Sequence, residues 1–389
     1  MTLVWNKLAL KETEVSLAKV LRCGQTFRWK SINNVWSFAI SDRIVLLKQD
    51  QDHIYYSQVL AKSEVGRVKG DVSQATLGFI QDYFALDVKL TDLYQEWKLN
   101  HKPYITTKVK QQQSPFDLFS GIRTLRQDPW ECLISFICSS NNNVKRISKM
   151  CDNLCIQFGN YINDYEGIPF YSFPTPQQLS SDPSVESKLR ELGFGYRAKY
   201  IYQTACKFTD DDTYPHINLA HLMQLRQCSY EEAHEFLLQL TGVGPKVADC
   251  ICLMSLDKSN VVPIDTHVYQ IAVRDFKYRG GGKREMKTLS KAMHDDIRRF
   301  FQGIFGDYAG WAQSVLFAAD LTDLNNGVNI VETKKEKEVS GKESKVKIKT
   351  EEEIKISSAG SKRTKTIKLE SNNKRVKTIK ADLTTVVKS

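Results

Sequence analysis

Apolar and polar residues alternate along much of the first sixty residues of the chain. The alternating segments lie within residues 26–60 and read TFRWK, VWSFAI, RIVLLKQ and HIYYSQV. This period of two is typical of half-buried strands, and the pair Asn33-Asn34 between the first two segments suits a tight hairpin turn. We therefore expect an antiparallel meander near the N-terminus.

The pattern becomes helical further along the chain. Around residues 75–98 the apolar positions include Leu77, Ile80 and Phe84, which share one face of a helix. Helical spacing then continues from about residue 126 to residue 325, with breaks at segments such as GIPFYSFPTP (167–176). These patterns predict a strand-rich N-terminal domain at 1–125 and an all-helical body at 126–328.

The composition changes again near the C-terminus. Residues 331–389 contain no aromatic residue and no proline, and they carry 17 Lys/Arg against 9 Asp/Glu. Such a segment cannot bury enough apolar surface to offset its ordering entropy, so we expect a disordered basic tail at 329–389. The clusters SKRTK (361–365) and NKRVK (373–377) within it suit nuclear import or non-specific DNA contact. We expect a nuclear protein; a minor mitochondrial pool stays open.

The net charge of +10 is concentrated in that tail, because the first 330 residues carry 38 basic and 36 acidic side chains. The folded part must therefore bind any nucleic acid through a local patch and backbone amides. No apolar run has membrane-spanning length, so we expect no membrane contact. Nine scattered cysteines fit a reducing compartment better than a disulfide framework.

The segment LTGVGPK at 240–246 is the most informative short motif in the chain. Gly242 and Gly244 allow a tight turn and a close approach, because neither carries a Cβ. Pro245 suits the first turn of a helix, and the free N–H groups of that turn can bind a phosphate. Lys246 lies beside this position. An ordinary turn followed by a solvated lysine would give the same pattern, so the motif alone leaves both interpretations open.

Asp265 follows nineteen residues after Lys246. It precedes the helical spacing Val268, Ile271 and Ala272, which predicts that Asp265 is the N-cap of that helix.

With four further segments, the hairpin resembles the eukaryotic 8-oxoguanine DNA glycosylase/AP lyase family, within the helix-hairpin-helix, Gly-Pro-Asp superfamily. These segments are CGQTFRW (23–29), FICSSNNNVKRI (136–147), LGFGYRAKY (192–200) and YAGWAQSVLFAADL (308–321). They run in the family's order and cover residues 20–325. The resemblance implies an α+β fold, in which a twisted antiparallel sheet similar to the TATA-box-binding fold packs on an all-α helix-hairpin-helix body.

The resemblance assigns the chemistry to Lys246 and Asp265. Lys246 would attack C1′ of the damaged nucleotide and form a Schiff base, after which β-elimination would cut the strand on the 3′ side. Asp265 would stabilise the positive charge that develops on the sugar. The attacking amine must be neutral. The helix N-terminus should lower its pKa, whereas an ionised Cys250, on the same helix face at i+4, would oppose this.

The remaining site residues are also implied by the resemblance. The flipped base would stack between Phe317 and Cys250, with Gln313 on its Watson–Crick edge. The main-chain carbonyl of Gly24 would accept a hydrogen bond from N7–H, which guanine lacks.

DNA would be contacted by a set of residues from the motifs quoted above: Asn141, Arg146, Tyr196, Arg197, Gly242, Gly244, Val247 and His267. In this set Asn141 would fill the gap left by the flipped base, and the two arginines would bond the unpaired cytosine. Tyr196 would wedge into the opposite strand, and His267 would contact a phosphate. A cation held by main-chain carbonyls near Leu240 and Val243 is implied as well.

The sequence thus predicts a monomeric enzyme without a cofactor that excises 8-oxoguanine, and ring-opened formamidopyrimidine purines, opposite cytosine in duplex DNA. One alternative is a superfamily member for another lesion. The absence of cysteine after Cys252 argues against the iron–sulfur pyrimidine enzymes, and Lys246 argues against the alkyl-base enzymes. The other alternative is a non-catalytic helix-hairpin-helix DNA-binding module, which would need neither Lys246 nor Asp265.

Overall fold

The computed structural model describes residues 3–65, 71–104, 114–280 and 290–321, together with the backbone of four strands between residues 330 and 382. The chain divides into two compact units, Met1–Val331 and Glu332–Ser389. None of the described helices is long and apolar enough to cross a membrane.

The N-terminal sheet is the predicted antiparallel meander with one further strand on each side. Its strands follow the order β1-β5-β4-β3-β2-β8, in which only β8 pairs in parallel. They are β1 (Asn6–Ala9), β2 (Lys30–Ile32), β3 (Val35–Ala39), β4 (Arg43–Gln49), β5 (His53–Leu60) and β8 (Ile330–Val331). Asn33 and Asn34 both have positive φ, of 48° and 61°, as a two-residue hairpin turn requires. The segment TFRWK (26–30) was expected to be a strand, but β2 contains only its last residue, Lys30, and continues to Ile32.

Apolar side chains pack on both faces of this sheet. On one face Trp29, Phe38 and Tyr83 belong to a cluster of aromatic rings, to which α2 (Val72–Tyr83) contributes. The other face packs against the hairpin of β6 (Tyr161–Tyr165) and β7 (Ile168–Tyr171). The sheet is therefore an inner layer of the first unit.

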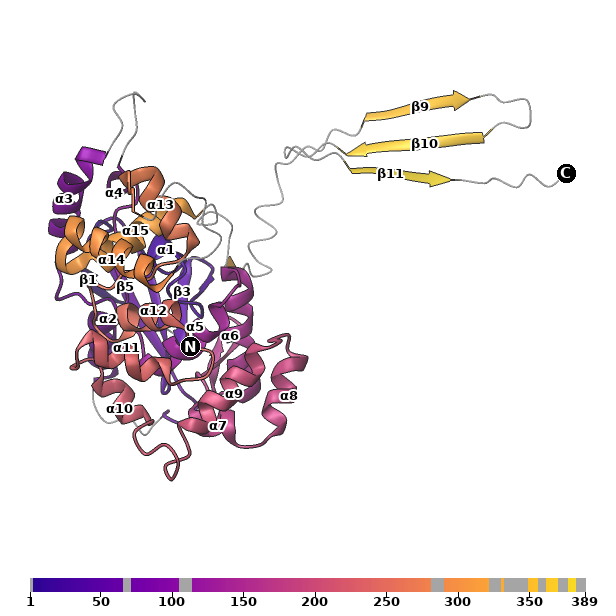
Figure 1. Ribbon diagram of the computed structural model, residues 1–389. Helices are drawn as coiled ribbons and strands as arrows, with labels where there is room; N and C mark the ends of the chain where they lie inside the picture. The colour runs from indigo at the N-terminus through magenta and orange to yellow at the C-terminus, as the bar shows by residue number, and fades with distance from the viewer. Residues whose placement is uncertain are drawn as a thin grey trace. The chain divides into compact units, whose positions relative to one another are not determined.

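The body is helical apart from that hairpin, as Figure 1 shows. The predicted fold class, a sheet domain with a helical body, is confirmed. The β6–β7 hairpin was not predicted, because two strands of five and four residues are too short to establish an alternating pattern. Glu166 and Gly167, both with positive φ, form the turn between them. The helices up to the hairpin lysine are α1 (Leu17–Val20), α3 (Leu90–His101), α4 (Pro115–Leu118), α5 (Pro129–Ser139), α6 (Val144–Phe158), α7 (Pro176–Ser180), α8 (Ser184–Glu191), α9 (Arg197–Lys207), α10 (Leu219–Gln224) and α11 (Tyr230–Leu238). The helices after it are α12 (Pro245–Ser255), α13 (Thr266–Phe276), α14 (Lys291–Phe305) and α15 (Ala309–Asp320).

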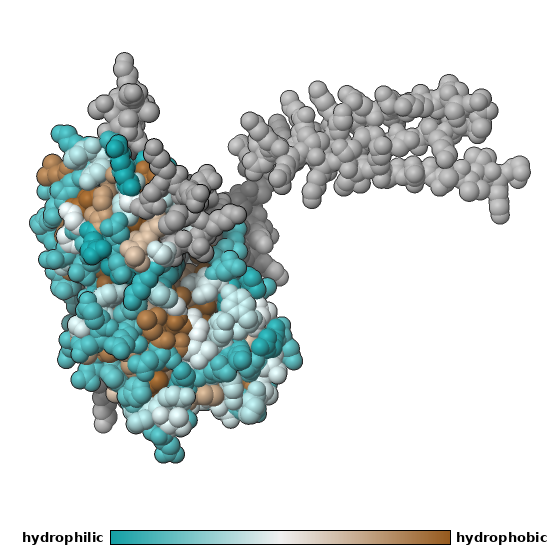
Figure 2. Space-filling model, viewed as in Figure 1, coloured by the Kyte–Doolittle hydropathy of each residue, from teal (hydrophilic) through white to brown (hydrophobic). Residues whose placement is uncertain are grey.

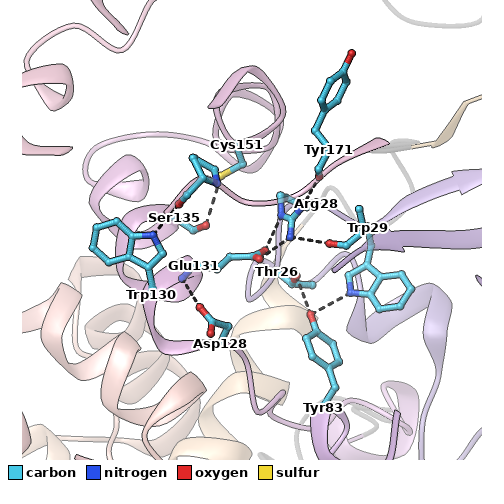
Figure 3. Close-up of polar contacts among 12 residues, drawn as sticks. Thr26, Arg28, Trp29, Tyr83, Asp128, Trp130, Glu131, Ser135, Cys151 and Tyr171 are labelled. Atoms are coloured by element: carbon cyan, nitrogen blue, oxygen red, sulfur yellow. Dashed lines mark hydrogen bonds and ion pairs between the residues drawn. The ribbon is translucent and has the colours of Figure 1, made fainter. Parts of the chain in front are cut away.

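A buried ion pair joins the CGQTFRW segment to the helical body. Arg28 donates from Nε and Nη2 to the two carboxylate oxygens of Glu131 on α5, at 2.8 and 2.6 Å, and Nη2 also donates to the Ala39 carbonyl. Burial acts to lower the pKa of Arg28, but the Glu131 carboxylate raises it above the ordinary value. Tyr83 bridges Thr26 and Trp29 beside this pair, as Figure 3 shows. The segment that follows Gly24 is thus held by polar contacts inside the protein.

The second unit contains three antiparallel strands in the order β11-β10-β9. They are β9 (Lys349–Lys355), β10 (Lys362–Leu369) and β11 (Lys377–Asp382). The rest of the predicted tail after β8 lies outside the described residues, so its disorder stays a prediction from composition.

Candidate active site

The two glycines of the hairpin, Gly242 and Gly244, have different structural roles. Gly242 has φ +84°, and a Cβ there would lie 2.7 Å from ring atoms of Tyr200. Gly244 has an ordinary φ of −98° and is the N-cap of α12, and a Cβ there would meet nothing within 4 Å. Pro245 occupies the first turn of α12, as predicted. Gly242 therefore allows the hairpin to pack, whereas Gly244 leaves open space at the helix N-terminus.

Lys246 and Asp265 meet at the starts of two helices. The Lys246 Nζ lies 3.7 Å from the Asp265 Oδ2. The other carboxylate oxygen, Oδ1, accepts hydrogen bonds of 3.0 Å from the backbone N–H groups of His267 and Val268. The predicted N-cap is confirmed, and the same carboxylate also faces the lysine. Both side chains are about one-third exposed, at 38% and 32%, so a substrate can reach them.

The protein raises the pKa of the Lys246 amine above its ordinary value, because the Cys250 sulfur and the Asp265 carboxylate both favour the charged form. Burial raises the pKa of the Cys250 thiol to about 11, so this side chain is a neutral thiol near pH 7. Asp265 is then the charge that holds Lys246 protonated. The net shift of the lysine pKa in the free protein is therefore upward, against the lowering expected from the helix N-terminus alone.

A cavity of about 1480 Å³ opens beside this pair. Its lining includes all four residues proposed for base recognition: Gly24, Cys250, Gln313 and Phe317. Gly24 has φ +87°, and a Cβ there would lie 3.8 Å from the Phe317 ring. No hydrogen bond engages the Gly24 carbonyl within the described residues. Segments almost three hundred residues apart in the sequence therefore form one cavity wall.

The molecular surface near α11 and α12 is partly apolar. In Figure 2 apolar surface gathers near the middle of the viewed face, over the region where Figure 1 shows α11 and α12, and hydrophilic surface surrounds it. An apolar hollow with a few polar groups is typical of a ligand site.

The three consecutive asparagines have three different environments. Asn143 is the N-cap of α6, and Asn142 donates to the Cys138 carbonyl. Asn141 is exposed, has a left-handed φ of 50°, and lines the cavity. In the described part of the chain no hydrogen bond holds its side chain. Asn142 and Asn143 line the cavity too, so what distinguishes Asn141 is a side chain without hydrogen bonds to the described residues.

The LGFGYRAKY segment lies next to the asparagines. Tyr196 is 46% exposed and donates from its hydroxyl to the Ser140 carbonyl at 3.2 Å. Arg197 is buried and donates to the carbonyls of Ser140 and Asn141. Arg146 is exposed and donates to the Gly193 carbonyl at 3.1 Å. In the free protein Arg197 therefore supports the asparagine loop through its Nη2 atom.

The remaining predicted residues lie at the edges of the site. His267 lies 2.8 Å from the Asp320 carboxylate, and its ring meets the Phe317 ring edge-on at 5.2 Å. Val247 is buried in the cavity wall. The Leu240 carbonyl accepts the Val243 N–H at 3.2 Å. Within the described residues no group of three or more His, Cys, Asp or Glu side chains could hold a metal, and the main-chain cation stays a prediction.

Sequence reasoning missed a buried polar cluster behind the lysine. Asp249, one turn from Lys246 on α12, accepts hydrogen bonds from Arg298 at 2.6 Å and from the Tyr230 hydroxyl at 2.7 Å. The wall also contains Arg22, which precedes the CGQTFRW segment. An aspartate inside the apolar helix VADCICLM was the available indication of the first cluster. Nothing in the local pattern indicated Arg22.

Comparisons with known proteins match this arrangement along most of the chain. Residues 7–133 match the family model of the 8-oxoguanine DNA glycosylase N-terminal domain. Residues 134–294 match that of the HhH-GPD superfamily of base excision DNA repair proteins. The N-glycosylase/DNA lyase of Saccharomyces cerevisiae is 38% identical over 360 residues, which cover 87% of this chain and 92% of the relative.

The chain belongs to the 8-oxoguanine DNA glycosylase family. It is an N-glycosylase/DNA lyase. The family's member from Arabidopsis thaliana is 36% identical over 82% of this chain and 80% of its own length. Among solved structures, the Clostridium acetobutylicum 8-oxoguanine glycosylase/lyase bound to duplex DNA with cytosine opposite 8-oxoguanine has a TM-score of 0.61 and 27% identity, covering 82% of this chain and 97% of that chain.

Proposed function

We propose that this glycosylase removes 8-oxoguanine, and ring-opened formamidopyrimidine purines, opposite cytosine in duplex DNA, and then nicks the strand through a lysine Schiff base. The observation that carries the proposal is the 3.7 Å approach of Lys246 to Asp265 at the edge of a cavity large enough to admit a nucleotide. A DNA-binding module without catalysis would not need an amine and a carboxylate in this arrangement.

The chemistry begins with a proton. Lys246 must lose one before it attacks C1′, and Asp265, the nearest carboxylate to the ammonium, can accept it and pass it to the departing base, which leaves Asp265 charged again. As the base leaves, positive charge develops on the sugar, and the Oδ2 atom of Asp265 is available to stabilise it because Oδ1 is already committed to the helix. The amine that has bonded to C1′ becomes an iminium when the C1′–O4′ bond breaks, which opens the sugar ring and leaves a hydroxyl at C4′ after O4′ takes a proton. The iminium acidifies the C2′ proton, and β-elimination breaks the 3′ C–O bond.

Base selection would rest on other residues that line the cavity. The unengaged Gly24 carbonyl can accept N7–H from 8-oxoguanine and would repel the N7 lone pair of guanine. Gln313 is buried in the cavity wall and carries both donors and acceptors for the Watson–Crick edge. We further propose that the enzyme acts as a nuclear monomer.

The test is borohydride trapping on duplex DNA that carries one 8-oxoguanine opposite each of the four bases. We expect a covalent adduct that is strongest opposite cytosine and is lost in Lys246→Gln. Base release without an adduct would contradict the Schiff base and would indicate an activated water. No reaction opposite any base would contradict the lesion assignment.

A further inference from the structure

Arg22 is a cation in the wall of the catalytic cavity without an acidic partner. Its Nε and Nη2 atoms are buried, and neither has a hydrogen-bond partner. No ion pair of the described residues involves it, although it lines the same cavity as Lys246 and Phe317. Burial lowers the pKa of Arg22 from its ordinary value, yet a guanidinium stays protonated in proteins. The cavity wall therefore holds a positive charge that the fold does not neutralise.

Two other cations of this wall are neutralised: Lys246 lies 3.7 Å from the Asp265 carboxylate, and Arg298 lies 2.6 Å from the Asp249 carboxylate. Lys291 also lines the cavity, but its side chain is exposed to solvent, whereas Nε and Nη2 of Arg22 are buried. An ion that is removed from water without a partner destabilises a fold, and such groups persist mainly where function requires them. The unpaired state of Arg22 in this wall therefore indicates a ligand that brings the missing negative charge.

We propose that Arg22 binds a phosphate group of the damaged DNA strand. A guanidinium offers parallel N–H donors that match phosphate oxygens, together with a full positive charge. The damaged base is neutral, so its carbonyl dipoles would offset the desolvation of Arg22 less than an anion would. A nucleotide that enters the cavity carries a phosphate on each side of its sugar, so the substrate itself supplies the anion. This assignment rests on the proposed action on DNA.

The test variant is Arg22→Met, which keeps the length of the side chain and removes its charge. We expect the affinity for an 8-oxoguanine duplex to fall about tenfold, the effect of losing one charge-assisted contact. The slope of the logarithm of the association constant against the logarithm of the salt concentration should decrease in magnitude by about 0.9, the value for one phosphate contact fewer. The melting temperature of the free protein should not fall, because Arg22 is only partly buried and has no ion-pair partner among the described residues. A residue that serves only the fold would instead lower the stability without changing the salt slope.

Two matched variants complete the experiment. Lys89→Met removes one charge from a lysine that is 71% exposed and outside the cavity lining, and it should leave both the salt slope and the melting temperature unchanged. Arg22→Lys keeps the charge and should restore most of the slope.

Three outcomes would overturn the assignment. A lower melting temperature with an unchanged salt slope would make Arg22 a residue of the fold. Weaker binding to the 8-oxoguanine duplex, but unchanged binding to an abasic-site analogue, would place the base at Arg22 instead of a phosphate. An effect on the salt slope equal to that of Lys89→Met would show that Arg22 contributes only to the overall charge of the protein. Wild-type protein without preference for the lesion would contradict the proposed function instead, and the salt slope on the abasic-site duplex would still decide the phosphate contact.

Discussion

Single side chains of this site divide their polar atoms between the fold and the cavity. Asp265 gives one oxygen to the first turn of α13 and the other to Lys246. The asparagine triplet makes a similar division: all three residues line the cavity, but the side chains of Asn142 and Asn143 hydrogen-bond to the backbone, and that of Asn141 has no hydrogen bond to the described residues. Stability and activity are therefore separable at residue resolution, by substitutions that remove one function and keep the other.

Asp265→Asn is such a substitution. Asparagine is an equally good N-cap, so we expect little change in melting temperature. Loss of the negative charge should slow base excision by about 10²–10³-fold. It should also lower the pKa of Lys246, which Cys250 and Asp265 raise in the wild type. More neutral amine is then present at a given pH. The pH profile of borohydride trapping at a preformed abasic site should therefore move to lower pH.

Asp265→Ala is the control for this prediction. It removes the charge and the cap together, so it should reproduce the kinetic effects and also lose about 1 kcal/mol of unfolding free energy. A trapping profile that stays in place in both variants would show that Asp265 does not hold the lysine proton.

Among the elements, the hairpin before α12 allows a matched comparison of two glycines. Gly242→Ala forces a Cβ to within 2.7 Å of the Tyr200 ring at φ +84°, so we expect a loss of about 2–4 kcal/mol in urea unfolding. Gly244→Ala meets no neighbour and should cost less than about 1 kcal/mol. Its methyl group points into open space at the helix N-terminus, so it should weaken DNA binding instead. Equal stability losses in the two variants would contradict this division.

A second element-scale prediction concerns the pair between the CGQTFRW segment and α5. Arg28→Met leaves a buried Glu131 without its cation, and Glu131→Leu leaves Arg28 without its anion, so each should cost about 3–5 kcal/mol. The double variant leaves neither charge and should be more stable than either single variant. A double-mutant cycle in urea measures the coupling, and simple additivity of the two losses would count against the pair.

The sequence was sufficient for those parts of the site that depend on local pattern. It predicted Asp265 as a helix cap, Pro245 in a first turn, and Asn33-Asn34 as a hairpin turn, because each is fixed by the residues beside it. It could not predict the β6–β7 hairpin, which is stabilised by packing on a distant sheet. Nor could it predict the raised pKa of Lys246 or the unpaired Arg22, since both depend on which distant groups surround a charge.

At the scale of the whole molecule, most of the net charge lies outside the residues that form the cavity. Residues 331–389 carry most of the net charge of +10, whereas the family match and the cavity lie before them. A chain that ends at Val331 should therefore keep its melting temperature and its excision rate under saturating conditions. We expect it to bind undamaged duplex more weakly at low salt, and the difference should disappear as salt rises. Filter binding over a salt series measures this, and a fall in melting temperature would show that the tail supports the fold.

The double use of Asp265 has a consequence for heat inactivation. Its distance from Lys246 depends on the first turn of α13, and helix ends open far more readily than whole domains unfold. When that turn frays, the carboxylate is free to swing away while every other helix stays in place. Excision should then decline at temperatures where circular dichroism still reports a folded protein, and it should return at once on cooling. The temperature at which excision is reversibly lost would then depend on the strength of a single helix cap.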